Sequence, residues 1–255
     1  MTFRRHLAAL CASLAVVAWL ALAGSALAAF PNYTGCPSRS ATVWACIDIQ
    51  NTRGNLNIKG FNVPLGESLE IRGAISLPDE EGNNVFTPAR GTTGFFSTSV
   101  RVPGGLLGIE WLPGNEVLAT TELAGSSSDI HINTDNQSIR IPVKVRLSNF
   151  LFGMNCHIGT STNPVVLNLI TGTTNPPPPN RPISGRVGTP SITPEEIRVI
   201  DNVNVNNEFA IPASSSCGLG LGLINALIDA RLRLPSAAGN NSIEVHNNLA
   251  LSPAP

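Results

Sequence analysis

Three polar residues near the middle of the chain have the types and the spacing of a metal site. Asp129, His131 and Asp135 alternate with apolar residues, so an extended strand over 129–135 would place their side chains on one face. Carboxylate oxygens and an imidazole nitrogen gathered on one face are ligands for a divalent metal. We favour the alternative, a solvent-facing side of an edge strand, and we expect no cofactor.

The usual signatures of catalysis do not occur in the sequence. It contains no G-x-S-x-G, H-E-x-x-H, S-x-x-K or P-loop motif. The pairs Glu80-Glu81 and Glu195-Glu196 would suit glycoside hydrolysis by type, but both lie in polar segments typical of turns. We therefore favour a non-catalytic protein of unknown ligand, with a secreted hydrolase of unrecognised type as an alternative.

A short apolar segment is the strongest candidate for contact with a partner. Leu106, Leu107, Ile109 and Trp111 lie between two Pro-Gly turns. If the segment is a loop, it exposes large apolar side chains, which is typical of a site for a partner or a membrane. If it is a short strand, these side chains belong to the core, and we expect the strand.

Alternation of apolar and polar residues dominates the chain and predicts β-strands. The segments that show it are 69–77, 139–147 and 243–251, and more weakly 43–49, 55–61, 95–102, 117–123, 165–171, 197–203 and 208–212. Pro142 has no N–H to donate, which predicts an edge strand or a bulge at that point. About ten short strands predict an all-β fold, a mainly antiparallel sandwich or partly closed barrel.

Two segments depart from the strand pattern. Residues 219–232 carry apolar side chains at helical spacing and are followed by Pro235, which predicts one short helix in the C-terminal half. Four consecutive prolines near 175–182 adopt the extended polyproline II conformation. We expect this segment to be a stiff crossover inside a single β domain of residues 29–255, rather than a link between two domains.

Residues 1–28 have the pattern of a cleavable export signal. Arg4 and Arg5 precede an apolar run, and Ser25 to Ala28 form a small-x-small cleavage site. No later stretch is long and apolar enough for a transmembrane helix. We expect cleavage after Ala28 and a secreted or cell-surface protein, with a retained anchor as the alternative.

Four cysteines follow the predicted signal: Cys36, Cys46, Cys156 and Cys217. An even number in an exported protein predicts disulfides, and four cysteines allow three pairings. Proximity in the sequence favours Cys36 with Cys46, which leaves Cys156 with Cys217. The C-x-x-C spacing of zinc sites is absent from all of them.

The composition limits the classes of partner. Only 13% of the residues are charged and the formal net charge is −1, so the chain lacks the basic field that binds nucleic acid. The partner that we expect is a component of the cell envelope. A β-barrel pore of an outer envelope is a further alternative, because alternation over about nine residues also fits a membrane-spanning strand.

The stretch around the prolines resembles an uncharacterised family of secreted actinobacterial proteins. The residues that carry the resemblance are Asn155 to Gly159, Asn163 to Leu169, and Thr171 through the prolines to Gly185. Cys217-Gly218, the helix pattern after it and the final strand pattern fit the same family, so the likeness covers residues 36–251. It implies export, paired cysteines and one β-rich unit, and no activity.

Overall fold

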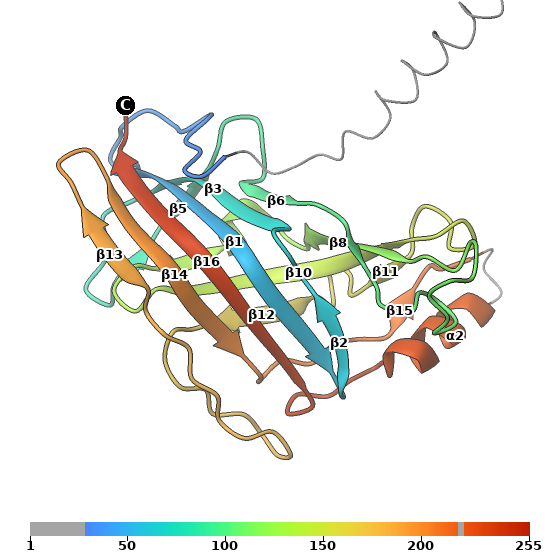
Figure 1. Ribbon diagram of the computed structural model, residues 1–255. Coiled ribbons are helices and arrows are strands. Elements are labelled where there is room, and N and C mark those ends of the chain that lie inside the picture. Colours follow the sequence, from blue (N-terminus) through green and yellow to red (C-terminus); the bar gives the residue numbers. More distant parts are fainter. Residues whose placement is uncertain (1–28, 219–221) are drawn as a thin grey trace, which may run out of the picture.

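A computed structural model describes residues 29–218 and 222–255. The predicted export signal, and residues 219–221 at the start of the predicted helix, lie outside the described residues. Two antiparallel sheets lie face to face and do not close into a barrel (Figure 1). The predicted all-β fold is therefore confirmed, and it has the form of a sandwich.

The first sheet is built around two long strands from opposite ends of the described chain. β1 (Ala45–Ile58) pairs along its whole length with β16 (Asn241–Pro253). The remaining strands of this sheet are β14 (Ile197–Asn206) and β13 (Thr189–Ile192) beyond β16, and β2 (Phe61–Pro64), β3 (Leu69–Ile75), β5 (Phe86–Pro88) and β6 (Phe95–Ser97) beyond β1. The strand predicted at 43–49 is the first part of β1. The strand predicted at 55–61 covers the end of β1, the turn after it and the first residue of β2.

The second sheet is organised around β10 (Ser138–Ser148). Its other strands are β4 (Asn83–Asn84), β7 (Val100–Arg101), β8 (Leu118–Leu123), β9 (His131–Asn133), β11 (His157–Ile158), β12 (Val165–Leu169) and β15 (Ser214–Ser215). A short 3-10 helix, η1 (Ser127–Asp129), precedes β9. The strands predicted at 117–123, 139–147 and 165–171 are β8, β10 and β12.

Pro142 does not lie in an edge strand, so the edge-strand alternative of that prediction is wrong. β10 has neighbours on both sides, and Pro142 pairs with Val166 of β12. The Pro142 carbonyl points to the other side, where it accepts a hydrogen bond from Ala124 N at 3.0 Å, one residue past the end of β8. The missing N–H would also point there, so its loss removes no bond from the β8–β10 ladder.

The structure also tests the predicted strand at 208–212 and the predicted helix at 219–232. The segment 208–212 is not a strand, because Ile211 makes only an isolated bridge with Ser236. The predicted short helix is present as α2, which spans Leu223–Leu232 and follows Gly222 in a left-handed conformation; residues 219–221 of the predicted range lie outside the described residues.

The core of the sandwich lies between the sheets and is formed by the inward side chains of alternating strands. Ile47 and Ile49 of β1 face Val143 and Leu147 of β10 in one cluster of buried residues. The proline segment leads from β12 of one sheet to β13 of the other. The N-terminal segment 29–44 lies over the outer face of the first sheet.

Both predicted cysteine pairs are present. Cys36 bonds to Cys46, and Cys156 bonds to Cys217. The first bridge holds the N-terminal segment to β1. The second bridge joins the end of the loop after β10 to the residue before Gly218 and α2.

We predict that the two bridges stabilise the fold unequally. A bridge that closes a separation of 61 residues restrains the unfolded chain by about 4 kcal/mol, and one that closes 10 residues by about 3 kcal/mol. The Cys156→Ala/Cys217→Ala variant should therefore lower the melting temperature by about 10 °C and by more than Cys36→Ala/Cys46→Ala, measured by calorimetry. Equal melting of the first variant and the wild type would contradict this expectation.

Candidate functional site

The structure does not place the three candidate metal ligands, Asp129, His131 and Asp135, on one strand. Only residues 131–133 of this segment form a strand, because Asp129 ends the 3-10 turn η1 and Asp135 lies in the turn after β9. Asp129 instead accepts hydrogen bonds from Ser126 N at 2.7 Å and Ser126 Oγ at 3.0 Å, which hold the pKa of its carboxyl below the usual value. The predicted strand over 129–135 is wrong, and no three His, Cys, Asp or Glu side chains in the described part of the chain are grouped to hold a metal ion.

The segment 105–114 is a loop, so the expectation of a core strand is wrong for most of it. Leu106 is buried, but three apolar side chains of the loop are exposed: Leu107, Ile109 and Trp111. Asn115 closes the base of the loop. Its side-chain oxygen accepts a hydrogen bond from Leu107 N at 2.7 Å, and its side-chain nitrogen donates to the Ile109 carbonyl at 2.6 Å. The hydrogen bonds of Asn115 therefore fix the backbone of the loop, while its apolar side chains are exposed to solvent.

A second apolar loop, which the sequence analysis missed, lies against the first. Phe150, Leu151 and Met154 follow β10 and are exposed, Met154 to 90%. Asn149 joins the two loops, because its side-chain nitrogen donates to the carbonyls of Gly114 at 2.9 Å and of Glu116 at 2.7 Å. A run of large apolar residues without any charge at 149–155, directly after a strong strand pattern, was the signal available in the sequence.

The helix α2 completes the same end of the molecule, beside the green loop before β8 (Figure 1). Arg231 donates hydrogen bonds to the carbonyls of Pro103 at 2.8 Å and Gly105 at 3.3 Å in the first loop. Gly218 N donates to the Phe152 carbonyl at 2.8 Å in the second loop. We define the apolar end as the eight exposed side chains Leu107, Ile109, Trp111, Phe150, Leu151, Met154, Leu223 and Leu227.

The loops of the apolar end carry little charge. Glu110 is the only charged residue of 103–115, and 149–155 has none. Arg231 is occupied by backbone carbonyls and by the ring of Phe61, whose centroid lies 4.6 Å from its guanidinium carbon. An exposed apolar patch with so few charges is typical of a contact site for a partner or a membrane.

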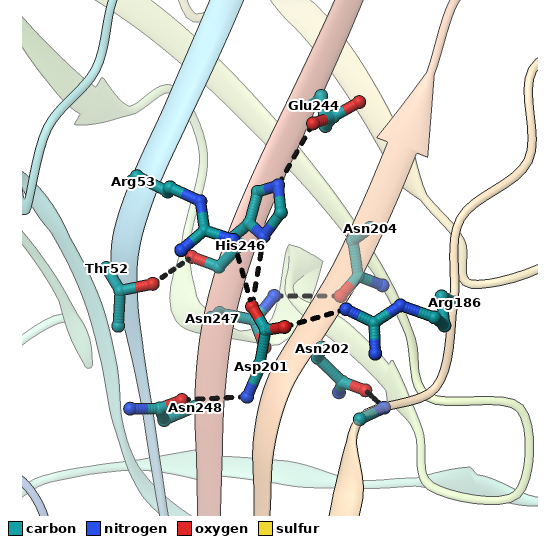
Figure 2. A network of polar contacts seen from close by, with 11 residues as sticks. Thr52, Arg53, Arg186, Asp201, Asn202, Asn204, Glu244, His246, Asn247 and Asn248 are labelled. Carbon is teal, nitrogen blue, oxygen red and sulfur yellow. Dashed lines mark hydrogen bonds and ion pairs between the residues drawn. The ribbon is translucent and has the colours of Figure 1, made fainter.

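A polar cluster on the first sheet is centred on Asp201 (Figure 2). The Asp201 carboxylate accepts a hydrogen bond from His246 Nδ1 at 3.1 Å and ion pairs from Arg186 at 2.7 Å and Arg53 at 3.2 Å. The hydrogen bonds from His246 and Arg186 lower the pKa of Asp201 to about 2. Asp201 has a positive φ of 58° and lies where the register of β14 shifts against β16. The cluster therefore holds an irregular point of the sheet.

His246 lies between two carboxylates. Its Nδ1 is 3.1 Å from Asp201 and its Nε2 is 3.0 Å from Glu244. The hydroxyl of Thr52 donates to the backbone carbonyl of His246, and no hydroxyl or thiol of residues 29–218 and 222–255 bonds to the ring. The arrangement is an ion cluster that joins three strands, and it lacks a nucleophile paired with a base.

Two carboxyl groups are buried beneath the N-terminal segment. Asp48 of β1 is fully buried and Glu70 of β3 is 2% exposed. Asn32 contacts both, because its backbone N–H donates to Asp48 Oδ2 at 2.6 Å and its side-chain nitrogen to Glu70 Oε1 at 3.4 Å. Burial raises the pKa of Asp48 to about 7 and also raises the pKa of Glu70. Asp48 Oδ1 has no hydrogen-bond partner within the described chain, which also disfavours the ionised form.

We predict that Asp48 makes the protein less stable as the pH rises. The folded state holds its proton up to about pH 7, whereas the unfolded chain releases it near pH 4. The free energy of unfolding should therefore fall between pH 4 and 7, by up to about 1.4 kcal/mol per pH unit from this group. Urea unfolding of wild type and Asp48→Asn at pH 5 and pH 8 measures it. A variant with the same pH slope as the wild type would refute the assignment.

We predict that substituting two histidines changes the free energy of unfolding by different amounts. His246→Ala removes hydrogen bonds to two carboxylates and should cost about 1 to 2 kcal/mol of unfolding free energy. His131→Ala, at an exposed position of β9, should change it by about 0.5 kcal/mol or less. Urea denaturation of both variants is the measurement, and a larger loss for His131→Ala would show a role that its position in β9 does not explain.

The comparisons with known proteins leave the geometry as the source of functional inference. No family model, no curated protein and no solved structure matches the chain. The two surface features considered as contact sites are the apolar end and the ion cluster at Asp201. The ion cluster is satisfied within the protein, so the apolar end is the stronger candidate for a contact with another molecule.

Proposed function

We propose that this chain is an exported, non-catalytic protein that attaches to a lipid surface of the cell envelope through its apolar end. The observation that carries the proposal is the meeting of three separate segments, two loops and α2, whose exposed apolar side chains gather at one end of the sandwich. Loops placed on a rigid sheet scaffold are common carriers of binding function.

The exposure of the side chains favours a lipid surface over a protein partner. Trp111, Phe150 and Met154 are 82%, 77% and 90% exposed, so they stand out from the surface instead of lining a groove. Protein interfaces combine a well-packed centre with a polar rim that is rich in hydrogen bonds. Protruding apolar side chains in two loops that carry a single charged residue, Glu110, suit insertion among lipid chains, and Trp is favoured at the boundary between lipid and water.

The location outside the cytoplasm rests on separate observations. Two disulfides fit an oxidising compartment. The predicted export signal and the resemblance to secreted actinobacterial proteins point the same way. In the described residues, no helix has the length and apolar character needed to cross a bilayer.

We predict that the mature protein binds phosphatidylcholine vesicles and that Trp111→Ser/Phe150→Ser/Met154→Ser does not. Burying one large apolar side chain contributes about 1.5 to 3 kcal/mol, so losing three should weaken the partition into vesicles at least a hundredfold. Sedimentation with vesicles measures the bound fraction, and a blue shift of Trp111 fluorescence reports its insertion.

The matched control replaces three other exposed large apolar side chains, in Leu77→Ser/Val85→Ser/Ile192→Ser. It should bind vesicles as the wild type does. Equal loss in both variants would show nonspecific stickiness and overturn the proposal. Wild-type protein that ignores vesicles but forms dimers, and loses them in the apolar-end variant, would identify a second copy of the chain as the partner and would also overturn it.

A further inference from the structure

A hollow lies inside the sandwich. Two adjoining cavities, of about 100 Å³ and about 60 Å³, lie between the sheets. Five residues line both of them: Leu69, Thr121, Val143, Leu167 and Ile243. Apart from Thr121, the larger cavity is lined by apolar side chains alone. A single apolar cavity of about 150 Å³ stays free of water and binds a molecule of the size of benzene.

A buried polar residue that lines the smaller cavity has one side-chain atom without a partner among the described residues. Asn247 of β16 occupies an inward position between Val245 and Leu249, lines this cavity and is 3% exposed. Its Nδ2 donates to Asn204 Oδ1 at 2.8 Å (Figure 2). Its Oδ1 is shielded from solvent and accepts no hydrogen bond from any residue that the structure describes.

Two backbone carbonyls bonded to Asn204 determine which side-chain amide atom of Asn247 lacks a hydrogen-bond partner. The Nδ2 of Asn204 donates to the carbonyls of Gln137 at 2.8 Å and Leu169 at 3.4 Å, and a carbonyl can only accept. The other amide atom of Asn204, its oxygen, therefore faces Asn247 and needs a donor. Asn247 must supply its nitrogen, so the atom that remains free is an acceptor.

We propose that this hollow is a binding site for a small apolar molecule that carries one hydroxyl group, which donates a hydrogen bond to Asn247 Oδ1. Of the three other polar residues at the smaller cavity, Asn51, Glu70 and Thr121, two are already bonded: Asn51 Oδ1 accepts from Leu69 N at 2.6 Å, and Glu70 pairs with Arg72 at 3.1 Å. A buried acceptor that lacks a donor is unfavourable. A ligand hydroxyl relieves it, whereas a methyl group of the same shape does not.

The hollow approaches solvent along the edge where β6 meets β8. Leu69, Phe95 and Thr121 line it there and are only half-buried. The strands β6 and β8 belong to different sheets, and the hydroxyl of Ser97 on β6 bonds to the Thr121 carbonyl on β8. A ligand therefore enters by parting side chains at this edge, without breaking the ladders within either sheet.

Phenol and toluene test the proposal, because they have nearly the same shape and differ by a hydroxyl against a methyl group. Calorimetric titration of the mature protein should show phenol binding at least about tenfold more tightly than toluene. Thr121→Leu adds volume to the hollow and should weaken phenol binding at least tenfold. Thr120→Leu is the matched control, since Thr120 bonds to Ser99 on the opposite face of β8, and it should bind phenol as the wild type does.

Asn247→Leu removes the acceptor and should abolish the preference for phenol over toluene. It also leaves Asn204 Oδ1 without its donor, so if this variant does not fold, the Thr121→Leu and Thr120→Leu pair decides. Toluene binding as tightly as phenol, equal phenol affinity in the two threonine variants, or a phenol-soaked crystal with only water at Asn247 would overturn the proposal. The apolar-end variant should bind phenol as the wild type does. The phenol experiments therefore test this site independently of the proposed attachment to lipid.

Discussion

The pairing of β1 with β16 is the interaction on which the rest of the structure depends. It runs from Ala45 with Pro253 to Ile58 with Asn241 and joins opposite ends of the described chain. β14 is bonded to the free side of β16, and β2 and β3 to the free side of β1. Every other strand of the first sheet is placed outward from this pair, and the second sheet lies against the face that it forms.

The two side edges of the sandwich are closed in different ways. At the edge where β14 approaches β12, buried asparagines join the sheets, as Asn204 and Asn206 donate side-chain hydrogen bonds to the carbonyls of Leu169 and Asn168. Polar groups that are bonded at depth fix one arrangement of the strands. At the edge where β6 approaches β8, apolar side chains and the hydroxyl of Ser97 make the contact. The first edge is held in place, and the second is the one that can open around a ligand.

Alternation predicted the strands and their inward residues where the pairing is regular, as in β3, β10 and the final part of β16. It split β1 in two, because the bulge between Asn51 and Arg53 shifts the phase from inward odd positions to inward even ones. The burial of Asp48 could not be predicted from the sequence, because the segment that covers it is distant in sequence and only the fold brings Asn32 over it. The exposed loop at 149–155 escaped notice because an apolar run without charge reads equally well as core.

The position of β16 in the sheet sets the order in which the chain can fold. β16 lies between β14 and β1, and it comes after all the other strands along the chain. Until it has been synthesised, the first sheet lacks an inner member and the facing edges of β1 and β14 have nothing to pair with. The first sheet can therefore be completed only when the last of its strands has been synthesised.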